Sequence, residues 1–110
     1  MNTMIITTQD VFETDAMFVE DVEKAVEKLY LQNFDIVIFG KDIEASEEKK
    51  FRKILSLQNY EILVLRQEAE LLKFTVSQAK FMLRNYLYEK GKISIKENQI
   101  FNNESDKNPS

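Results

Sequence analysis

The chain has 110 residues and contains neither cysteine nor histidine. Hydrophobic residues make up 44% and charged residues 31%, which is typical of one soluble globular domain. The absence of cysteine excludes disulfides, thiol nucleophiles and thiolate metal sites, and the absence of histidine removes the commonest general base and metal ligand. We therefore expect no metal site and no cofactor. The formal net charge of −4, with acids and bases interleaved, argues against a nucleic-acid partner.

The N-terminal segment MNTMIITTQD lacks the basic and apolar regions of a signal peptide. No apolar run of the sequence reaches the roughly 20 residues that span a bilayer. The expected location is the cytoplasm, with no membrane partner.

The first elements are predicted from β-branched and apolar runs. Residues 4–8 predict a strand. A helix is expected to begin near Asp15, as its N-cap, and to end around residues 32–33, because apolar residues recur at helical spacing. That apolar stripe consists of Phe18, Val22, Ala25, Val26 and Leu29.

Two continuous apolar runs follow, at residues 36–39 and 62–65, and predict strands buried on both faces. Between them Ser46 is expected to cap a helix whose inner face carries Phe51, Ile54 and Leu55. The alternation of strands and helices predicts the α/β class. We expect a small three-layer βαβαβα domain of flavodoxin-like or receiver-like topology, with a mostly parallel sheet of three to four strands.

Residues 67–88 contain no Gly and no Pro and predict one long C-terminal helix, which Gly91 ends. Residues 92–96 alternate charged and apolar side chains and predict a short edge strand. We expect a single α/β domain over residues 1–101 and a disordered polar tail over residues 102–110.

The long helix carries two apolar stripes, whereas a helix lying on a sheet needs one. The first stripe is Leu72, Val76, Ala79, Leu83, Tyr86 and Leu87, and the second is Leu71, Phe74, Phe81, Met82 and Tyr88. The second stripe is either buried within the domain or forms a contact with another chain. Its aromatic residues and methionine favour a contact, so we predict a homodimer through Phe74, Phe81, Met82 and Tyr88, with a different protein as the alternative partner.

Polar residues at the carboxyl ends of the predicted strands are the candidate ligand-binding residues: Asp10, Lys41, Asp42 and Arg66. Two acids and two bases suit a small anion or a carboxylate–amine pair, although strand ends are also polar simply because they meet water. A phosphate-binding loop is excluded, because Asp42 follows Lys41 where Ser or Thr is required. A dinucleotide fingerprint needs three spaced glycines, and the chain has two.

The stretch FVEDVEKAVEKLYLQNFDIVIFGKDIE resembles the middle of a response-regulator receiver domain, which has a flavodoxin-like fold. The matching residues are Val22, Ala25, Val26 and Leu29 on the helix and residues 34–39 on the strand. The resemblance implies that a phosphoacceptor aspartate should end this strand, and the chain has Gly40 there. It also places Leu65 or Arg66 where the family has Ser or Thr. Since too few residues separate Thr8 from Asp35 for two helices and a strand, the first strand–helix unit of the family would be missing or rearranged.

These observations predict a non-catalytic interaction or scaffold module, homodimeric and resembling a receiver domain that cannot be phosphorylated. The alternative is a small-anion-binding protein or an enzyme with its site at the strand ends. Fold analogy alone does not decide between the two.

Overall fold

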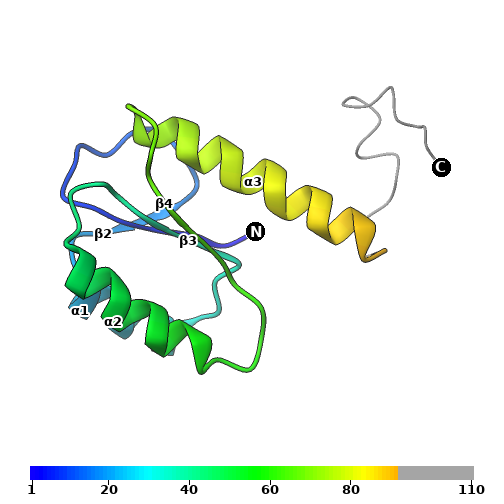
Figure 1. The fold of residues 1–110 in the computed structure, drawn as a ribbon, viewed down its shortest axis with the longest axis horizontal. Helices are drawn as coiled ribbons and strands as arrows, with labels where there is room; N and C mark the ends of the chain where they lie inside the picture. Colours follow the sequence, from blue (N-terminus) through cyan, green and yellow to red (C-terminus); the bar gives the residue numbers. More distant parts are fainter. Residues whose placement is uncertain (92–110) are drawn as a thin grey trace. The chain divides into compact units, whose positions relative to one another are not determined.

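The computed structural model describes residues 1–91, and its centre is an all-parallel sheet of four strands with the order β2-β1-β3-β4 (Figure 1). The strands are β1 (Thr3–Ile6), β2 (Met17–Val19), β3 (Ile36–Phe39) and β4 (Leu63–Arg66). This order agrees with the first four strands of the flavodoxin-like arrangement. The predicted α/β class is confirmed. The predicted strand at residues 92–96 and the predicted tail at residues 102–110 lie outside the described residues.

Three helices accompany the sheet: α1 (Val22–Leu31), α2 (Ala45–Ser56) and the long α3 (Leu72–Glu89). Two compact units divide the chain, and the boundary falls inside α3. The first unit, Met1–Lys80, contains the whole sheet, α1, α2 and the first half of α3. The second unit begins at Phe81.

The central strands β1 and β3 are buried at every residue, as the continuous apolar run at residues 36–39 predicts for β3. The same prediction for the run at residues 62–65 is wrong, because β4 lies at the edge of the sheet and is only partly buried. Side chains of a strand alternate between its two faces. One face packs with α1 and α2 into a core, while the first half of α3 lies on the other face (Figure 1). The main core residues are Met4, Ile6, Val22, Ala25, Leu29, Phe34, Val37, Phe39, Phe51 and Leu55. On the second face Leu72, Val76 and Ala79 of α3 are buried, as the first apolar stripe predicts.

The predicted helix start near Asp15 is wrong, because Met17–Val19 forms strand β2. Met17 and Val19 pair in parallel with Met4 and Ile6 of β1. Phe18 therefore belongs to a strand. The helix begins only after Asp21, whose Oδ1 accepts a 2.8 Å hydrogen bond from the Lys24 N–H. Phe18 stands four positions before Val22 and so imitates helical spacing, but its ring packs on Phe12 with the ring centroids 5.3 Å apart. Met17 and Val19, on the other side of β2, pack with the core that α1 covers.

The predicted helix cap at Ser46 is also wrong. Helix α2 begins at Ala45, and the residue at its N-cap is Glu44, whose side chain makes no capping hydrogen bond. The prediction for the end of the long helix is confirmed. Gly91 has φ +73°, and its N–H donates a 2.9 Å hydrogen bond to the Tyr88 carbonyl.

Candidate functional site at the strand ends

The candidate site lies at the carboxyl ends of β1, β3 and β4, where three loops meet. Strand order reverses between β1 and β3, since the chain continues from β1 to β2 on one side and to β3 on the other. In open α/β sheets such a reversal leaves a crevice in which ligands bind. The residues around this crevice belong to the segments 7–10 and 40–42 and to Gln67.

A carboxylate of the chain itself fills the crevice. Oδ1 of Asp42 accepts hydrogen bonds from the Thr7 hydroxyl (2.7 Å) and from Nε2 of Gln9 (2.9 Å). Oδ2 accepts from the Thr8 N–H (2.7 Å) and the Thr8 hydroxyl (2.9 Å). Hydroxyl, amide and backbone N–H donors of this kind bind phosphate or carboxylate ligands in other sites. In this chain their ligand is Asp42.

These contacts change the acidity of Asp42. Partial burial raises the pKa of the carboxyl group, but the hydrogen bonds from Thr8, Thr7 and Gln9 outweigh burial and hold the pKa well below its usual range. Asp42 therefore stays ionised throughout the neutral range. A carboxylate with so low a pKa is a poor general base near neutral pH.

Gln67 extends this arrangement to the third loop. Its side chain is buried, and Oε1 accepts from Nε2 of Gln9 (2.8 Å) and from the Lys41 N–H (3.0 Å). Its Nε2 donates to the carbonyls of Ala69 (3.0 Å) and Glu70 (3.3 Å). Gln67 thus satisfies its polar atoms inside the protein and ties the three loops together. We call these five residues the Asp42 cluster: Thr7, Thr8, Gln9, Asp42 and Gln67.

Close packing at the end of β3 leaves no room for a side chain at Gly40. A Cβ atom on Gly40 would contact Oδ1 of Asp42 and would lie 2.6 Å from Oγ1 and 2.8 Å from Cβ of Thr7. No φ in the left-handed region is involved, because Gly91 is the one glycine among the described residues with positive φ. A glycine at the end of β3 therefore lets the Asp42 carboxylate approach Thr7 and Thr8.

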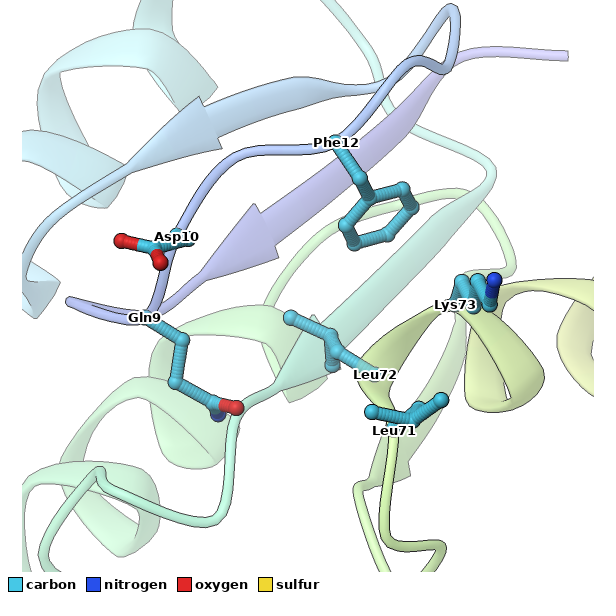
Figure 2. Close-up of a pocket in the computed structure, with 6 residues that line it drawn as sticks. All are labelled: Gln9, Asp10, Phe12, Leu71, Leu72 and Lys73. Carbon is cyan, nitrogen blue, oxygen red and sulfur yellow. The ribbon is translucent and has the colours of Figure 1, made fainter.

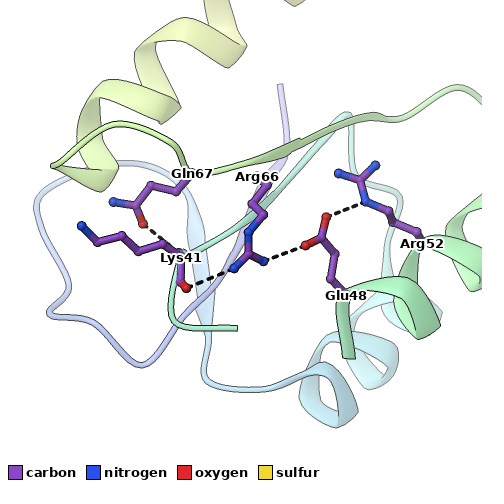
Figure 3. A network of polar contacts seen from close by, with 5 residues as sticks. All are labelled: Lys41, Glu48, Arg52, Arg66 and Gln67. Carbon is purple, nitrogen blue, oxygen red and sulfur yellow. Dashed lines mark hydrogen bonds and ion pairs between the residues drawn. The ribbon is translucent and has the colours of Figure 1, made fainter. Parts of the chain in front are cut away.

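A second set of polar contacts lies beside the Asp42 cluster and involves Arg66 (Figure 3). Its Nη1 donates to Oε1 of Glu48 at 2.7 Å, and its Nη2 donates to the Lys41 carbonyl at 3.1 Å. The other carboxylate oxygen of Glu48 accepts from Nε of Arg52 at 2.7 Å. Partial burial raises the pKa of Glu48, but the hydrogen bonds from Arg52 and Arg66 outweigh burial and leave it below the usual range. These contacts join the end of β4 to the start of α2.

The four predicted ligand-binding residues do not converge on one point. Arg66 turns to Glu48 on α2, whereas Nζ of Lys41 lies 3.5 Å from the Glu70 carbonyl, just before α3. Helix α2 and the first half of α3 lie on opposite faces of the sheet (Figure 1). The Asp42 carboxylate accepts hydrogen bonds from Thr7, Thr8 and Gln9. The fourth residue, Asp10, is exposed. The structure thus places Lys41, Asp42 and Arg66 at one edge of the sheet but directs their charged groups to separate partners.

Asp10 borders an open hollow of about 560 Å³ between the loop after β1 and the start of α3 (Figure 2). Phe12 comes from that loop, and Leu71 and Leu72 come from the start of α3. The lining is completed by Gln9 and Lys73. The hollow is largely apolar, so it differs in chemistry from the anion site that the sequence suggested.

The cluster residues that were not among the predicted ligand-binding residues are Thr7, Thr8, Gln9 and Gln67. Two threonines directly after a strand were a usable signal, since their hydroxyls can serve as donors at a strand end. The role of Gln67 in joining the loops carried no local signal, because the partners of its Oε1, Lys41 and Gln9, lie 26 and 58 residues away in the chain.

The apolar residues of the predicted interface lie on α3. Phe74 is 55% exposed, Phe81 48% and Met82 40%, and Leu71, immediately before the helix, is 48% exposed. Tyr88, the fourth residue of the prediction, is partly buried. Three of the four residues are therefore exposed to solvent.

Within residues 1–91 no group of three or more acidic side chains has the arrangement needed to hold a metal ion. In the same part of the chain, no helix has the length and apolar character that crossing a membrane requires. Comparisons with protein-family models, curated proteins and solved structures give no match to this chain. The fold and site define the class: a small parallel α/β protein whose strand-end crevice is filled by its own side chains.

Proposed function

We propose that the protein is a non-catalytic interaction module of the cytoplasm, which forms a homodimer through one face of α3. The observation that carries this proposal is the exposure of the large apolar side chains Leu71, Phe74, Phe81 and Met82. Large contiguous apolar patches are uncommon on monomeric proteins, and aromatic residues and methionine are enriched in interfaces. Other exposed apolar residues lie elsewhere, such as Tyr30 on α1 and Leu57 just after α2.

The strand-end region supports a non-catalytic module over an anion-binding protein or an enzyme. The Asp42 carboxylate already accepts hydrogen bonds from its neighbours in the Asp42 cluster, and Arg66 already donates to Glu48. A ligand would therefore have to displace these contacts within the chain. A receiver-like domain without phosphotransfer is part of the same proposal. The space around Gly40 gives an independent reason for glycine where a receiver has its phosphoacceptor.

Sedimentation equilibrium tests this proposal directly. Wild-type protein is expected to give a mass that rises from monomer to dimer between low and several hundred micromolar concentrations. Phe74→Glu should remain a monomer throughout, because it places a charge in the proposed contact. The matched control is Tyr30→Glu, which introduces the same charge at an aromatic residue that is 86% exposed on α1, and it should dimerise as the wild type does.

Circular dichroism must show that both variants keep their helical content. A wild-type protein that stays monomeric at the highest concentration would refute the proposal. So would a Phe74→Glu variant that dimerises as well as Tyr30→Glu.

A further inference from the structure

Phe74, Phe81 and Met82 of α3, with Leu71 just before the helix, belong to a face whose own side chains are uncharged from residue 71 to residue 85. The other exposed apolar residue of α3, Tyr86, lies off this face, and the Lys73 ammonium reaches its edge over the Phe74 ring. With about 100° of rotation per residue, this face covers roughly 100° of the helix surface. Its centre lies roughly 120° from the line of buried residues that includes Ala79. We call it the uncharged face of α3, and it consists of Leu71, Phe74, Gln78, Phe81, Met82 and Asn85.

The uncharged face suits a second copy of the same chain as its occupant. Two identical charged faces repel each other, but two copies of an uncharged face do not. Positions 71, 78 and 85 are separated by seven residues each, and Phe74 and Met82 are both four residues from Gln78. The face is therefore nearly symmetric about Gln78.

Charges near the ends of α3 favour an antiparallel pair of helices. Glu89 continues the uncharged face at its C-terminal end. At the N-terminal end lie two ammonium groups, that of Lys41 beside the Glu70 carbonyl and that of Lys73 over the Phe74 ring. In a parallel pair Glu89 would face its own copy. In an antiparallel pair it approaches the partner's positive end, where the helix dipole also favours an anion.

We infer that the dimer is antiparallel, with its two-fold axis passing beside Gln78 of α3. In this arrangement Phe74 packs on Met82 of the second copy, a contact that pairs an aromatic ring with a thioether. Leu71 lies opposite Asn85, and the two Gln78 amides hydrogen-bond to each other across the axis. This inference rests on the proposed function, and it specifies how the two copies meet.

The absence of cysteine from the whole chain makes a clean test available, because every introduced thiol is unique. Three variants place a thiol along the uncharged face: Leu71→Cys, Gln78→Cys and Asn85→Cys. A fourth, Ser77→Cys, is the matched control, since Ser77 is exposed on the same helix but lies off that face. Each variant is oxidised in dilute solution, and the disulfide-linked dimer is measured on non-reducing gels.

The antiparallel arrangement predicts that Gln78→Cys crosslinks at least about tenfold faster than Ser77→Cys, because only its two thiols meet across the axis. Leu71→Cys and Asn85→Cys should each remain uncrosslinked, and an equal mixture of the two should form the mixed disulfide. A parallel dimer would instead crosslink Leu71→Cys and Asn85→Cys each with itself, which would overturn the inference.

Sedimentation of the reduced variants distinguishes whether a dimer forms at all from whether its helices are antiparallel. If they are dimers but Gln78→Cys crosslinks no faster than Ser77→Cys, the antiparallel arrangement is wrong and the proposed function stands. If they and the wild type are monomers, whether because another segment or another protein covers the face, both the arrangement and the proposed function are wrong.

Discussion

The backbone N–H of Thr8 donates a 2.7 Å hydrogen bond to Oδ2 of Asp42, across the boundary between the loops that follow the two central strands. The two residues are 34 positions apart in the chain, and only parallel pairing of β1 with β3 brings them together. Because the Asp42 carboxylate belongs to the same chain as its donors, its effective concentration at the crevice is high. The crevice that would receive a soluble ligand is therefore filled by the fold itself, and Asp42 should be important for stability.

Replacing Asp42 by Asn tests this importance. One carboxylate oxygen becomes an NH₂ donor that faces the donors of Thr7 and Gln9 or of Thr8, so hydrogen bonds are lost whichever way the amide turns. We expect the free energy of unfolding to fall by about 1–2 kcal/mol, allowing for partial exposure. Urea denaturation measures the change. Asp10→Asn is the control and should change stability by less than about 0.5 kcal/mol, because Asp10 is exposed in the hollow. Equal losses in the two variants would contradict the assignment.

Asp42 should also make stability depend on pH. Its pKa is lowered in the folded protein from an ordinary value of 3.8, so its stabilisation is complete above that value and is lost as the pH falls toward the folded pKa. We expect the difference in stability between wild type and Asp42→Asn to be smaller at about pH 3 than at about pH 6. Urea titrations at both pH values measure it. Glu48 and Asp15 have lowered pKa values as well, but they are common to both proteins and cancel in this difference. A difference that does not change with pH would show that the charge of Asp42 is not responsible.

Gly40→Ala is expected to destabilise the protein by about 2–3 kcal/mol, because the added methyl group collides with Asp42 and Thr7 where the packing leaves no space. The informative comparison is Gly91→Ala. Nothing lies within 4 Å of a Cβ at Gly91, but its φ of +73° disfavours alanine, and we expect a cost of about 1 kcal/mol. Chemical denaturation of both variants distinguishes steric exclusion from backbone conformation. If Gly40→Ala were the milder change, the close approach of Asp42 to β3 would be incorrect.

Local patterns predicted best the strand whose burial is uniform. The run at residues 36–39 was recognisable because a strand covered on both faces must be apolar throughout. The run at residues 62–65 also predicted a strand, but β4 lies at the edge of the sheet and is only partly buried. Strand β2 was not recognisable in the same way. It has three residues, and Phe18 stands four positions before Val22, so the edge strand and the following helix read as one stripe.

The candidate site could be located from the sequence but not described. Its place followed from the strand ends, and Asp42 was among the residues expected there. The roles of Gly40 and Gln67 depend on neighbours distant in the chain. Gly40 looked like a missing acceptor, whereas the contacts that require a glycine come from the Asp42 carboxylate and from Thr7, which lies 33 positions earlier. No local spacing encodes such a contact.

The face of the sheet covered by α3 contains two buried hydroxyls, those of Thr3 and Thr75, that have no hydrogen-bond partner among the described residues. Thr75→Val removes one of these groups and keeps the shape of the side chain. We expect the free energy of unfolding to rise by about 1 kcal/mol, because a buried unsatisfied hydroxyl carries a desolvation cost. Thr7→Val is the matched control, since the Thr7 hydroxyl donates to Asp42, and it should lower stability by about 1 kcal/mol. Thermal and urea denaturation report both. A loss in Thr75→Val would mean that its hydroxyl has a partner in solution.

Gln67→Glu changes one atom of a buried amide whose donors and acceptors are all used. The new oxygen would face the carbonyls of Ala69 and Glu70, to which Nε2 of Gln67 donates. The Lys41 ammonium lies near the same Glu70 carbonyl, but burying a carboxylate against two carbonyl oxygens is still costly. We expect the free energy of unfolding to fall by about 2–3 kcal/mol near pH 7.

The stability of Gln67→Glu should also depend on pH. Burial and the facing carbonyls would raise the folded pKa of this carboxyl above its unfolded value, so the loss is greatest at high pH and diminishes as the pH falls. Between about pH 7 and about pH 5 Asp42 is ionised in both the folded and the unfolded protein, so it adds no pH dependence to the stability of the wild type over this range. Gln67→Met lacks a titratable group, and its deficit should stay constant over this range while that of Gln67→Glu shrinks. Parallel pH series of urea denaturation measure both variants, and identical pH profiles would contradict the amide orientation that joins the three loops.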